Sequence, residues 1–219
     1  VVGVPISFAL RNPSDTPDSD ARPSSSTQDV SPAPRGLLRF LIFQTLAMPF
    51  ILLAGWALAA FESNPARSDL ALMAAVCLGL GFAFWLAVFP FYSWIPLLVE
   101  ENAPYHVGFV LLVLQAADLL LGLNFLASYN WLNTNLDFLA TIRVVGVLMI
   151  GTAGVWSIFQ TNLQRLFGYA VIVETGFSLL ALSLYNQIGR DLFASMFLPR
   201  LIGIGLWSLA LSVLLPKVP

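Results

Sequence analysis

Residues 106–128 of the chain read HVGFVLLVLQAADLLLGLNFLAS, and this stretch decides the fold class. Asp118 is its only Asp, Glu, Lys or Arg residue, and a helix of roughly 20 apolar residues is long enough to cross a bilayer core of about 30 Å. The whole chain has the same character, with 58% hydrophobic and 10% charged residues in 219 positions. Soluble domains carry roughly 25% charged residues, so the composition indicates that lipid is the solvent of this chain.

Five further apolar blocks predict membrane-spanning helices, at residues 37–61, 70–89, 139–160, 166–185 and 192–215. The block 70–89 is interrupted at Pro90 and continues as a shorter apolar run to residue 99, because proline removes a helix donor and disfavours helical geometry before it. We therefore predict an all-α membrane protein of about six transmembrane helices, one of them discontinuous at Pro90.

The N-terminal part of the sequence differs from the rest. Residues 1–10 are apolar but too short to span a membrane, and they lack the basic flank of a signal peptide. We interpret them as the tail of a truncated transmembrane helix, which predicts that the sequence is a fragment. Residues 11–36 are rich in Ser, Pro, Asp and Arg and predict a flexible loop. Residues 37–219 form the predicted transmembrane helical bundle.

Basic residues are distributed unequally between the two predicted sides of the membrane. One side holds six of them, Arg11, Arg22, Arg35, Arg39, Arg165 and Lys217, and the other side holds Arg67 and Arg190. Cytoplasmic loops carry an excess of Lys and Arg. This bias predicts that residues 11–36 and both ends of the bundle are cytoplasmic.

Several kinds of site are excluded by composition. The only cysteine, Cys77, can form no internal disulfide, and with the only histidine, His106, it makes no Cys/His metal cage. The sequence has no Gly-rich turn between a strand and a helix, so it predicts no NAD or flavin site. One cysteine cannot hold an iron–sulfur cluster. The net charge of −2, without a basic patch, argues against nucleic acid. We expect no metal, no cofactor and no catalytic redox residue in this chain.

Apart from residues at the helix ends, four charged side chains fall within the predicted helices, namely Asp118, Glu174, Arg143 and Arg200. A charge at the centre of a membrane helix costs roughly 2.5–3.5 kcal/mol on insertion scales, so such residues mark function or pairing. These four are our candidates for a proton path. Gln115 and Gly122 lie on the face of Asp118, and Ser178 lies one turn from Glu174.

Three interpretations of these residues stay open on the sequence alone. Asp118 and Glu174 are stations of a midplane proton path, or they are structural ion-pair partners of Arg143 and Arg200. In the third interpretation they are neutral acids with no role in transport.

The segment around Pro90, FPFYSWIP at residues 89–96, contains two prolines and three kinds of aromatic side chain. A broken membrane helix frees backbone carbonyls, which are tolerated where they face protein or a water-filled cavity. The simpler interpretation is a proline kink beside an interfacial aromatic belt. Pro90, Tyr92, Trp94 and Pro96 are the candidate broken-helix motif.

Three stretches of the sequence, in this order along the chain, resemble a known family. LLRFL at 37–41 is similar to A-L-K-Y-F, and FPFYSWIP at 89–96, followed by Ala103, Pro104 and Val107, resembles F-P-F-H-x-W-L-P-D-A…A-P-T-P-V. NLQRLFGY at 162–169, followed by Gly176 and Phe177, resembles D-L-K-R-L-L-A-Y-S-S-I-S-H-M-G-F. These patterns are those of the antiporter-like, proton-channel membrane subunits of complex I, and the N-type (quinone-proximal) subunit is the member that the chain resembles most.

The resemblance implies a fold, a function and partners. The chain would run from the end of the family's fifth helix through the eleventh, with the loops before the sixth and tenth helices in the cytoplasm. It would be a membrane-arm subunit of a complex I-like NADH-quinone oxidoreductase, in contact with other membrane subunits, and it would contribute to proton translocation coupled to quinone reduction. The expected location is a bacterial plasma membrane, or an organellar inner or thylakoid membrane.

The sequence departs from the family at the residues that carry protons there. The family's lysine on the seventh helix corresponds to Trp85, and its partner on the eighth helix corresponds to Leu112 or Ala116. Tyr92 stands at the histidine of the first motif, and Glu174 stands at a later histidine. Either Asp118, Glu174 and the arginines form a substitute relay, or the subunit is a structural scaffold without its own proton path. An independent cation/proton antiporter is a further alternative.

Overall fold

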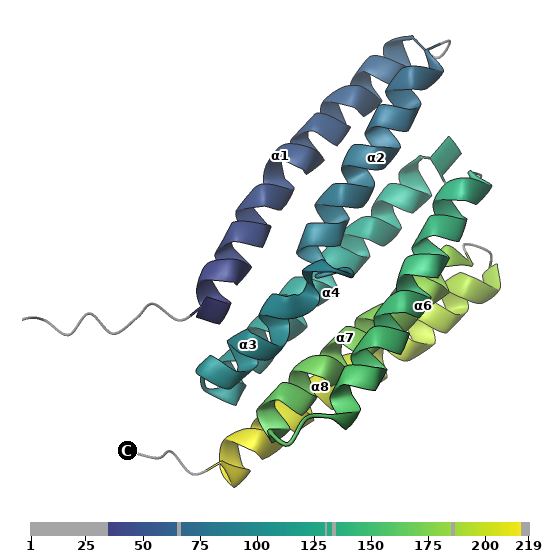
Figure 1. Ribbon diagram of the computed structural model, residues 1–219. Helices are drawn as coiled ribbons and strands as arrows, with labels where there is room; N and C mark the ends of the chain where they lie inside the picture. The colour runs from purple at the N-terminus through teal and green to yellow at the C-terminus, as the bar shows by residue number, and fades with distance from the viewer. Residues whose placement is uncertain (1–34, 65–66, 130, 133–134, 185–186, 216–219) are drawn as a thin grey trace, which may run out of the picture. The chain divides into compact units, whose positions relative to one another are not determined.

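The computed structural model describes residues 35–64, 67–129, 131–132, 135–184 and 187–215. The described chain is helical, without a strand in these ranges (Figure 1). Its elements are α1 (Arg35–Ser63), α2 (Ser68–Trp85), η1 (Phe91–Ser93), α3 (Trp94–Glu101), α4 (Pro104–Ser128), α6 (Leu136–Ile158), α7 (Leu163–Ser183) and α8 (Gln187–Leu214). Six of them, all except η1 and α3, are long and apolar enough to cross a membrane. The predicted all-α class and the six spans are confirmed.

Most of the two predicted N-terminal segments lies outside the described residues. The apolar residues 1–10 and all but the last two residues of the predicted loop 11–36 belong to the undescribed part of the chain. Helix α1 begins at Arg35, so only residues 35 and 36 of that loop are seen, and they are helical. The boundaries of the N-terminal segments therefore remain predictions.

The predicted discontinuity is present, but it begins earlier than Pro90. Helix α2 ends at Trp85, so the prediction that this helix reaches residue 89 is wrong. The N–H group of Val88 donates to the carbonyl of Ala83 at 2.8 Å, and Ala87 takes a positive φ of 52°. This is the usual geometry of a helix end, in which a residue in the left-handed region is normally glycine. Pro90 lies beyond this end and supplies no helix donor of its own.

Helix α3 continues the chain after the break and packs tightly between α1 and α7. A Cβ atom on Gly36 of α1 would lie 2.5 Å from the backbone nitrogen of Leu98, and a Cβ on Gly168 of α7 would lie 2.9 Å from the Cα of Pro96. Only glycine permits backbones to approach this closely. We call these two contacts the α3 clamp. Trp94, the first residue of α3, is fully buried and lies beside the ring of Phe40, with ring centroids 5.1 Å apart.

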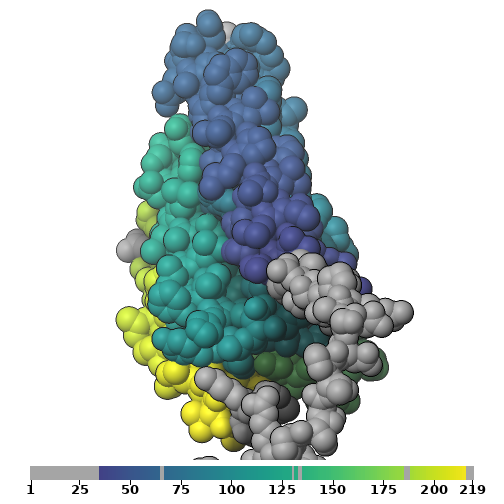
Figure 2. Space-filling model, turned by 90° about the vertical axis from the view of Figure 1, so that its left-hand side faces the viewer, coloured from purple at the N-terminus to yellow at the C-terminus, as the bar shows by residue number. Residues whose placement is uncertain are grey.

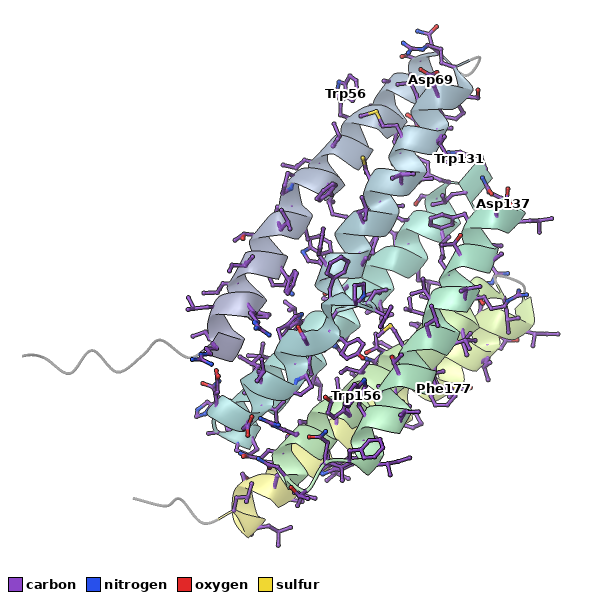
Figure 3. All side chains as sticks on the ribbon, viewed as in Figure 1. Trp56, Asp69, Trp131, Asp137, Trp156 and Phe177 are labelled. Atoms are coloured by element: carbon purple, nitrogen blue, oxygen red, sulfur yellow. The ribbon has the colours of Figure 1, made fainter. Side chains whose placement is uncertain are left out.

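Charged side chains lie at both ends of the helices. At one end, Arg165 pairs with Glu100 through Nη2 at 2.7 Å, and the N–H group of Gly36 donates to Glu101 at 2.6 Å. We call this the Arg165 end. The opposite end carries Asp69 and Asp137 (Figure 3). The Arg165 end is the side that the charge count predicts to be cytoplasmic.

The helices pack as pairs that leave many apolar side chains exposed. Helix α1 packs on α2, α6 packs on α7, and α8 packs on α4 and α7. In Figure 2 the side of α1 and the adjoining α3 face the viewer. Leu52 and Trp56 of α1 are 74% and 59% exposed, and Trp56 points away from the helix pair (Figure 3). Such a surface suits lipid or further membrane helices rather than water, and the chain is a multi-pass membrane protein.

Candidate functional site

A buried arginine lies where α4, α7 and α8 meet. Arg200 follows Pro199 in the middle of α8 and is 6% exposed. Its Nη1 donates to Oγ of Ser178 at 2.8 Å, and its Nη2 donates to Oε1 of Gln115 and to Oγ1 of Thr175, both at 2.9 Å. The guanidinium is therefore held by three neutral oxygens from two other helices. We call Arg200, Gln115, Thr175 and Ser178 the Arg200 cluster.

The oxygens that receive Arg200 are themselves fixed by further hydrogen bonds. The hydroxyl of Thr175 lies 3.1 Å from Oε1 of Gln115 and 2.8 Å from the carbonyl of Val171, and its single proton is donated to one of these two oxygens. Ser178 donates to the carbonyl of Glu174 at 3.0 Å. A network of this kind holds each of its members in one orientation. The network therefore holds the guanidinium in one orientation.

Glycine allows the helices of the cluster to approach one another. A Cβ atom on Gly108 of α4 would overlap the side chain of Ser208 of α8, so this position admits no larger residue without movement. The interface between α4 and α8 is therefore close at this level, as is typical of small residues in membrane helix packing. This contact brings Gln115 within reach of Arg200.

Arg200 makes no ion pair with a carboxylate in the described part of the chain. The ion pairs of Arg67 with Asp69 and of Arg165 with Glu100 both lie near helix ends rather than at the Arg200 cluster. The structure therefore does not form the ion pairs between the two acids and the two arginines that one interpretation of the sequence requires. Arg200 thus has hydrogen bonds to neutral oxygens and an electrostatic interaction with Glu174, but no carboxylate within ion-pair distance in the described residues.

Asp118 lies on the same face of α4 as Gln115 and is 8% exposed. Its Oδ2 atom is buried and makes no hydrogen bond in the described part of the chain. Asp118 lines a cavity of about 580 Å³ whose walls are mostly apolar side chains of α2, α4, α6 and α7. We call this the α2–α6 cavity. It extends to Asp137 at the first turn of α6, so it occupies the half of the bundle opposite the Arg165 end.

Glu174 lines a second cavity, of about 320 Å³, together with Arg200. We call it the α7–α8 cavity, and Phe167 and Trp207 place it on the side of the Arg165 end. Ser195 also lines it, and since Pro199 has no N–H group, the carbonyl of Ser195 lacks its usual helical partner. The cavity is therefore lined by residues that carry a carboxylate and a guanidinium, which suit water.

The candidate residues fall into two groups in space. Asp118, Glu174 and Arg200 lie close to the Arg200 cluster or belong to it. Arg143 does not, because it is exposed on α6 and makes no ion pair or hydrogen bond with the described residues. In sequence these four residues looked alike, and only the packing separates them.

The broken-helix motif has a packing role in the structure. Pro90 is exposed, whereas Tyr92, Trp94 and Pro96 are buried at the start of the α3 segment. Pro96 forms the α3 clamp with Gly168. The neighbouring Phe89 and Phe91 line the α2–α6 cavity.

The positions of the family lysines hold side chains that cannot bind a proton. Trp85 is the last residue of α2 and meets the edge of Phe82, with ring centroids 5.8 Å apart. Leu112 and Ala116 are partly buried on α4. None of the three belongs to the Arg200 cluster.

Thr175 is the functional candidate that sequence reasoning missed. It is fully buried and bonds both Gln115 and Arg200. Its signal was weak, because a threonine in a membrane helix ordinarily bonds its own backbone four residues earlier. Spacing does support it, since Thr175 and Ser178 are three residues apart on one face of α7.

The chain matches known proteins over most of its length. The family model described as NADH:quinone oxidoreductase/Mrp antiporter, TM, matches residues 40–218. The chain is 26% identical over 189 residues to NAD(P)H-quinone oxidoreductase chain 4, chloroplastic, of Mesostigma viride, with coverage of 78% of this chain and 36% of the relative. It is 30% identical over 116 residues to NADH-quinone oxidoreductase subunit N of Francisella tularensis subsp. holarctica, with coverage of 53% and 24%.

A third relative extends this picture. NAD(P)H-quinone oxidoreductase subunit 2 of a Synechococcus strain is 34% identical over 113 residues, which cover 52% of this chain and 21% of the relative. The chain thus spans about a fifth to a third of the length of these three relatives. No solved structure matches it.

The comparisons agree with the three sequence motifs on the antiporter-like group, although they include both chain 4 and subunit N relatives. Since the family model covers more than half of the chain, the chain belongs to the NADH:quinone oxidoreductase/Mrp antiporter transmembrane family.

Proposed function

We propose that this chain is part of a membrane-arm subunit of a complex I-like NAD(P)H-quinone oxidoreductase and contributes to proton translocation coupled to quinone reduction. The names of the relatives, the family match and the six apolar helices support this function. The other membrane subunits of such a complex are the expected partners. A plasma or thylakoid membrane is the expected location, because the relatives come from bacteria, cyanobacteria and chloroplasts.

The observation that carries the proposal is that two carboxylic acids, each within one helical turn of a residue of the Arg200 cluster, line different cavities. Asp118 lines the α2–α6 cavity, and Glu174 lines the α7–α8 cavity with Arg200. The two cavities occupy opposite halves of the helices. A proton path needs access from each side of the membrane and a barrier between the two access routes. In this proposal the Arg200 cluster is the barrier between the two cavities.

The three charged groups have different roles in this proposal. Asp118 exchanges protons with the side of Asp137, and Glu174 exchanges protons with the side of the Arg165 end. Arginine does not lose its proton in proteins, so Arg200 cannot be a carrier. Its fixed positive charge favours the departure of a proton from the nearer carboxylic acid, and it opposes the passage of other cations.

This arrangement replaces the family pattern rather than repeating it. Trp85, Leu112 and Ala116 cannot take up a proton, so a path through this chain must use other residues. Buried ionisable groups within membrane helices are functional candidates by default, because their insertion is unfavourable. Asp118 and Glu174 are the acidic groups that border a cavity at this depth.

The test is the double variant Asp118→Asn and Glu174→Gln in the assembled complex. We expect fewer protons moved per electron in sealed vesicles, with normal assembly on native gels, because amides keep the size and hydrogen bonds but carry no exchangeable acid proton. The matched control is Glu62→Gln, which changes an exposed carboxylate at the end of α1. Normal proton movement in the double variant would refute the proposal, and loss of assembly with normal pumping per complex would favour a scaffold.

A further inference from the structure

Gln115 is the residue through which Arg200 contacts the helix that carries Asp118. Its side chain is 1% exposed, and its Oε1 accepts from both Arg200 and Thr175. Gln115 and Asp118 are three residues apart on α4, so their Cβ atoms are about 5–6 Å from each other on one helix face. The guanidinium is therefore bound to an amide one turn away from a carboxylate.

Charge alone would favour a carboxylate, rather than the amide of Gln115, as the partner of Arg200 on α4. Hydrogen bonds between arginine and a carboxylate are roughly twice as strong as those between neutral groups, and they are often bidentate. Yet Oδ2 of Asp118 is buried without a hydrogen bond, and so is Nε2 of Gln115, within the described structure. Arg200 is thus bound by neutral oxygens, although Asp118 lies one turn from Gln115 on α4 and Glu174 acts on Arg200 electrostatically from α7.

We propose that Gln115 is a positioning residue that holds Arg200 away from Asp118 and so keeps this acid free of an ion pair. Oε1 of Gln115 accepts a hydrogen bond from Nη2 of Arg200, while Thr175 and Ser178 of α7 accept the other hydrogen bonds of the guanidinium. Without Gln115, Nη2 loses its bond to α4, and the guanidinium turns to Asp118. The importance of Gln115 for transport rests on the proposed function, but its effect on Asp118 can be measured separately.

The experiment measures the reaction of Asp118 with dicyclohexylcarbodiimide in the full protein in its native membrane. The reagent is apolar and reacts with the protonated form of a carboxyl group: the acid oxygen bonds to the central carbon, and the acid proton moves to nitrogen. Asp118 lines a mostly apolar cavity, and burial of an isolated ionised carboxylate is strongly unfavourable. We therefore expect Asp118 to be modified in the natural protein, as read by mass spectrometry of its peptide.

Three variants separate positioning from a merely structural effect. In Gln115→Leu, Asp118 pairs with Arg200, and we expect modification to fall at least about tenfold, which corresponds to about 1.4 kcal/mol. In Gln115→Glu a carboxylate takes the place of the amide against Arg200, so Asp118 stays reactive. Adding Arg200→Met to Gln115→Leu removes the competing cation and restores the modification.

The outcomes are distinguishable. The proposal is overturned if Asp118 is unreactive in the natural protein, if Gln115→Leu leaves its reactivity unchanged, or if the double variant stays unreactive. Normal proton pumping in Asp118→Asn would refute the proposed function but leave this pattern of reactivity intact. Folding of each variant is checked separately, by assembly of the complex on native gels.

Discussion

The α3 clamp and the α2–α6 cavity are the two extremes of packing in this molecule. In the clamp, Gly168 leaves so little space that a Cβ atom would lie 2.9 Å from the backbone of Pro96. In the cavity, a Cβ atom on Gly79 of α2 would have no neighbour within 4 Å, although this glycine lines the same space as Asp118. The same residue type therefore permits close backbone contact in one place and leaves open volume in the other.

The difference teaches how a broken membrane helix can be both stable and close to open space. Helix α3 is held by backbone contacts to α1 and α7, which compensate for the interruption of the chain after Trp85. Helices α2 and α6 are not in close contact, and the α2–α6 cavity lies between them. The close packing of α3 after the break therefore coexists with the α2–α6 cavity beside Asp118.

The largest effect is expected for a larger side chain in the clamp. Gly168→Leu adds four carbon atoms against the backbone of Pro96, which cannot move aside as a flexible side chain could. Overpacking of this kind destabilises by about 3 kcal/mol or more. We expect a lower midpoint of thermal unfolding in detergent. The matched control is Gly151→Leu on α6, where nothing lies within 4 Å, and equal destabilisation by both variants would contradict the clamp.

Access to Asp118 through the α2–α6 cavity is tested by a variant that fills this cavity. A Cβ atom at position 79 meets nothing within 4 Å, and Gly79→Phe directs a ring at the α2–α6 cavity that Gly79 lines. We expect stability to change little, while carbodiimide modification of Asp118 falls about tenfold, equal to about 1.4 kcal/mol. Gly55→Phe on the exposed face of α1 is the control. Unchanged modification with Gly79→Phe would mean that Asp118 is not reached through this cavity.

Much of the fold was predictable because lipid imposes a simple rule. Apolar blocks of about 20 residues predicted all six spans, with most ends within a few residues of those observed. The error at α2 has a local cause, since the helix ends at Trp85 and Ala87, just beyond it, takes a positive φ of 52°. Alanine gives no sequence signal for this conformation, which is normally marked by glycine, and the proline that was the signal lies further along the chain.

The site was predictable only in part. Charges in apolar helices identified Asp118, Glu174 and Arg200, but they also identified Arg143, which is exposed outside the cluster. The partners of Arg200 come from residues 22 to 85 positions away in sequence. Periodicity assigns residues to a face of one helix, but it does not determine which faces of different helices meet.

A smaller effect is expected from the carboxylate that binds the start of α1. The N–H group of Gly36 donates to Glu101 at 2.6 Å, and a negative group at a helix N-terminus satisfies a free donor and the helix dipole. Glu101→Ala should lower the free energy of unfolding by about 1 kcal/mol. Glu62→Ala, at the far end of the same helix, should have less effect. Equal stability of the two variants would mean that the hydrogen bond from Gly36 to Glu101 does not stabilise the contact between α3 and α1.

Only a small effect is expected from the ion pair of Glu100 and Arg165, although its geometry is good. Nε and Nη2 of Arg165 both lie 2.7 Å from Oε2 of Glu100. The two side chains are 41% and 31% exposed, and solvent-exposed pairs contribute roughly 0.5 kcal/mol because water screens them. Arg165→Met should therefore lower stability by about that amount, and the difference should vanish at high salt. Arg67→Met at the opposite end removes a more exposed pair and should cause a still smaller change. A loss with Arg165→Met as large as that of Gly168→Leu, persisting in salt, would show that charge rather than backbone contact holds α3 against α7.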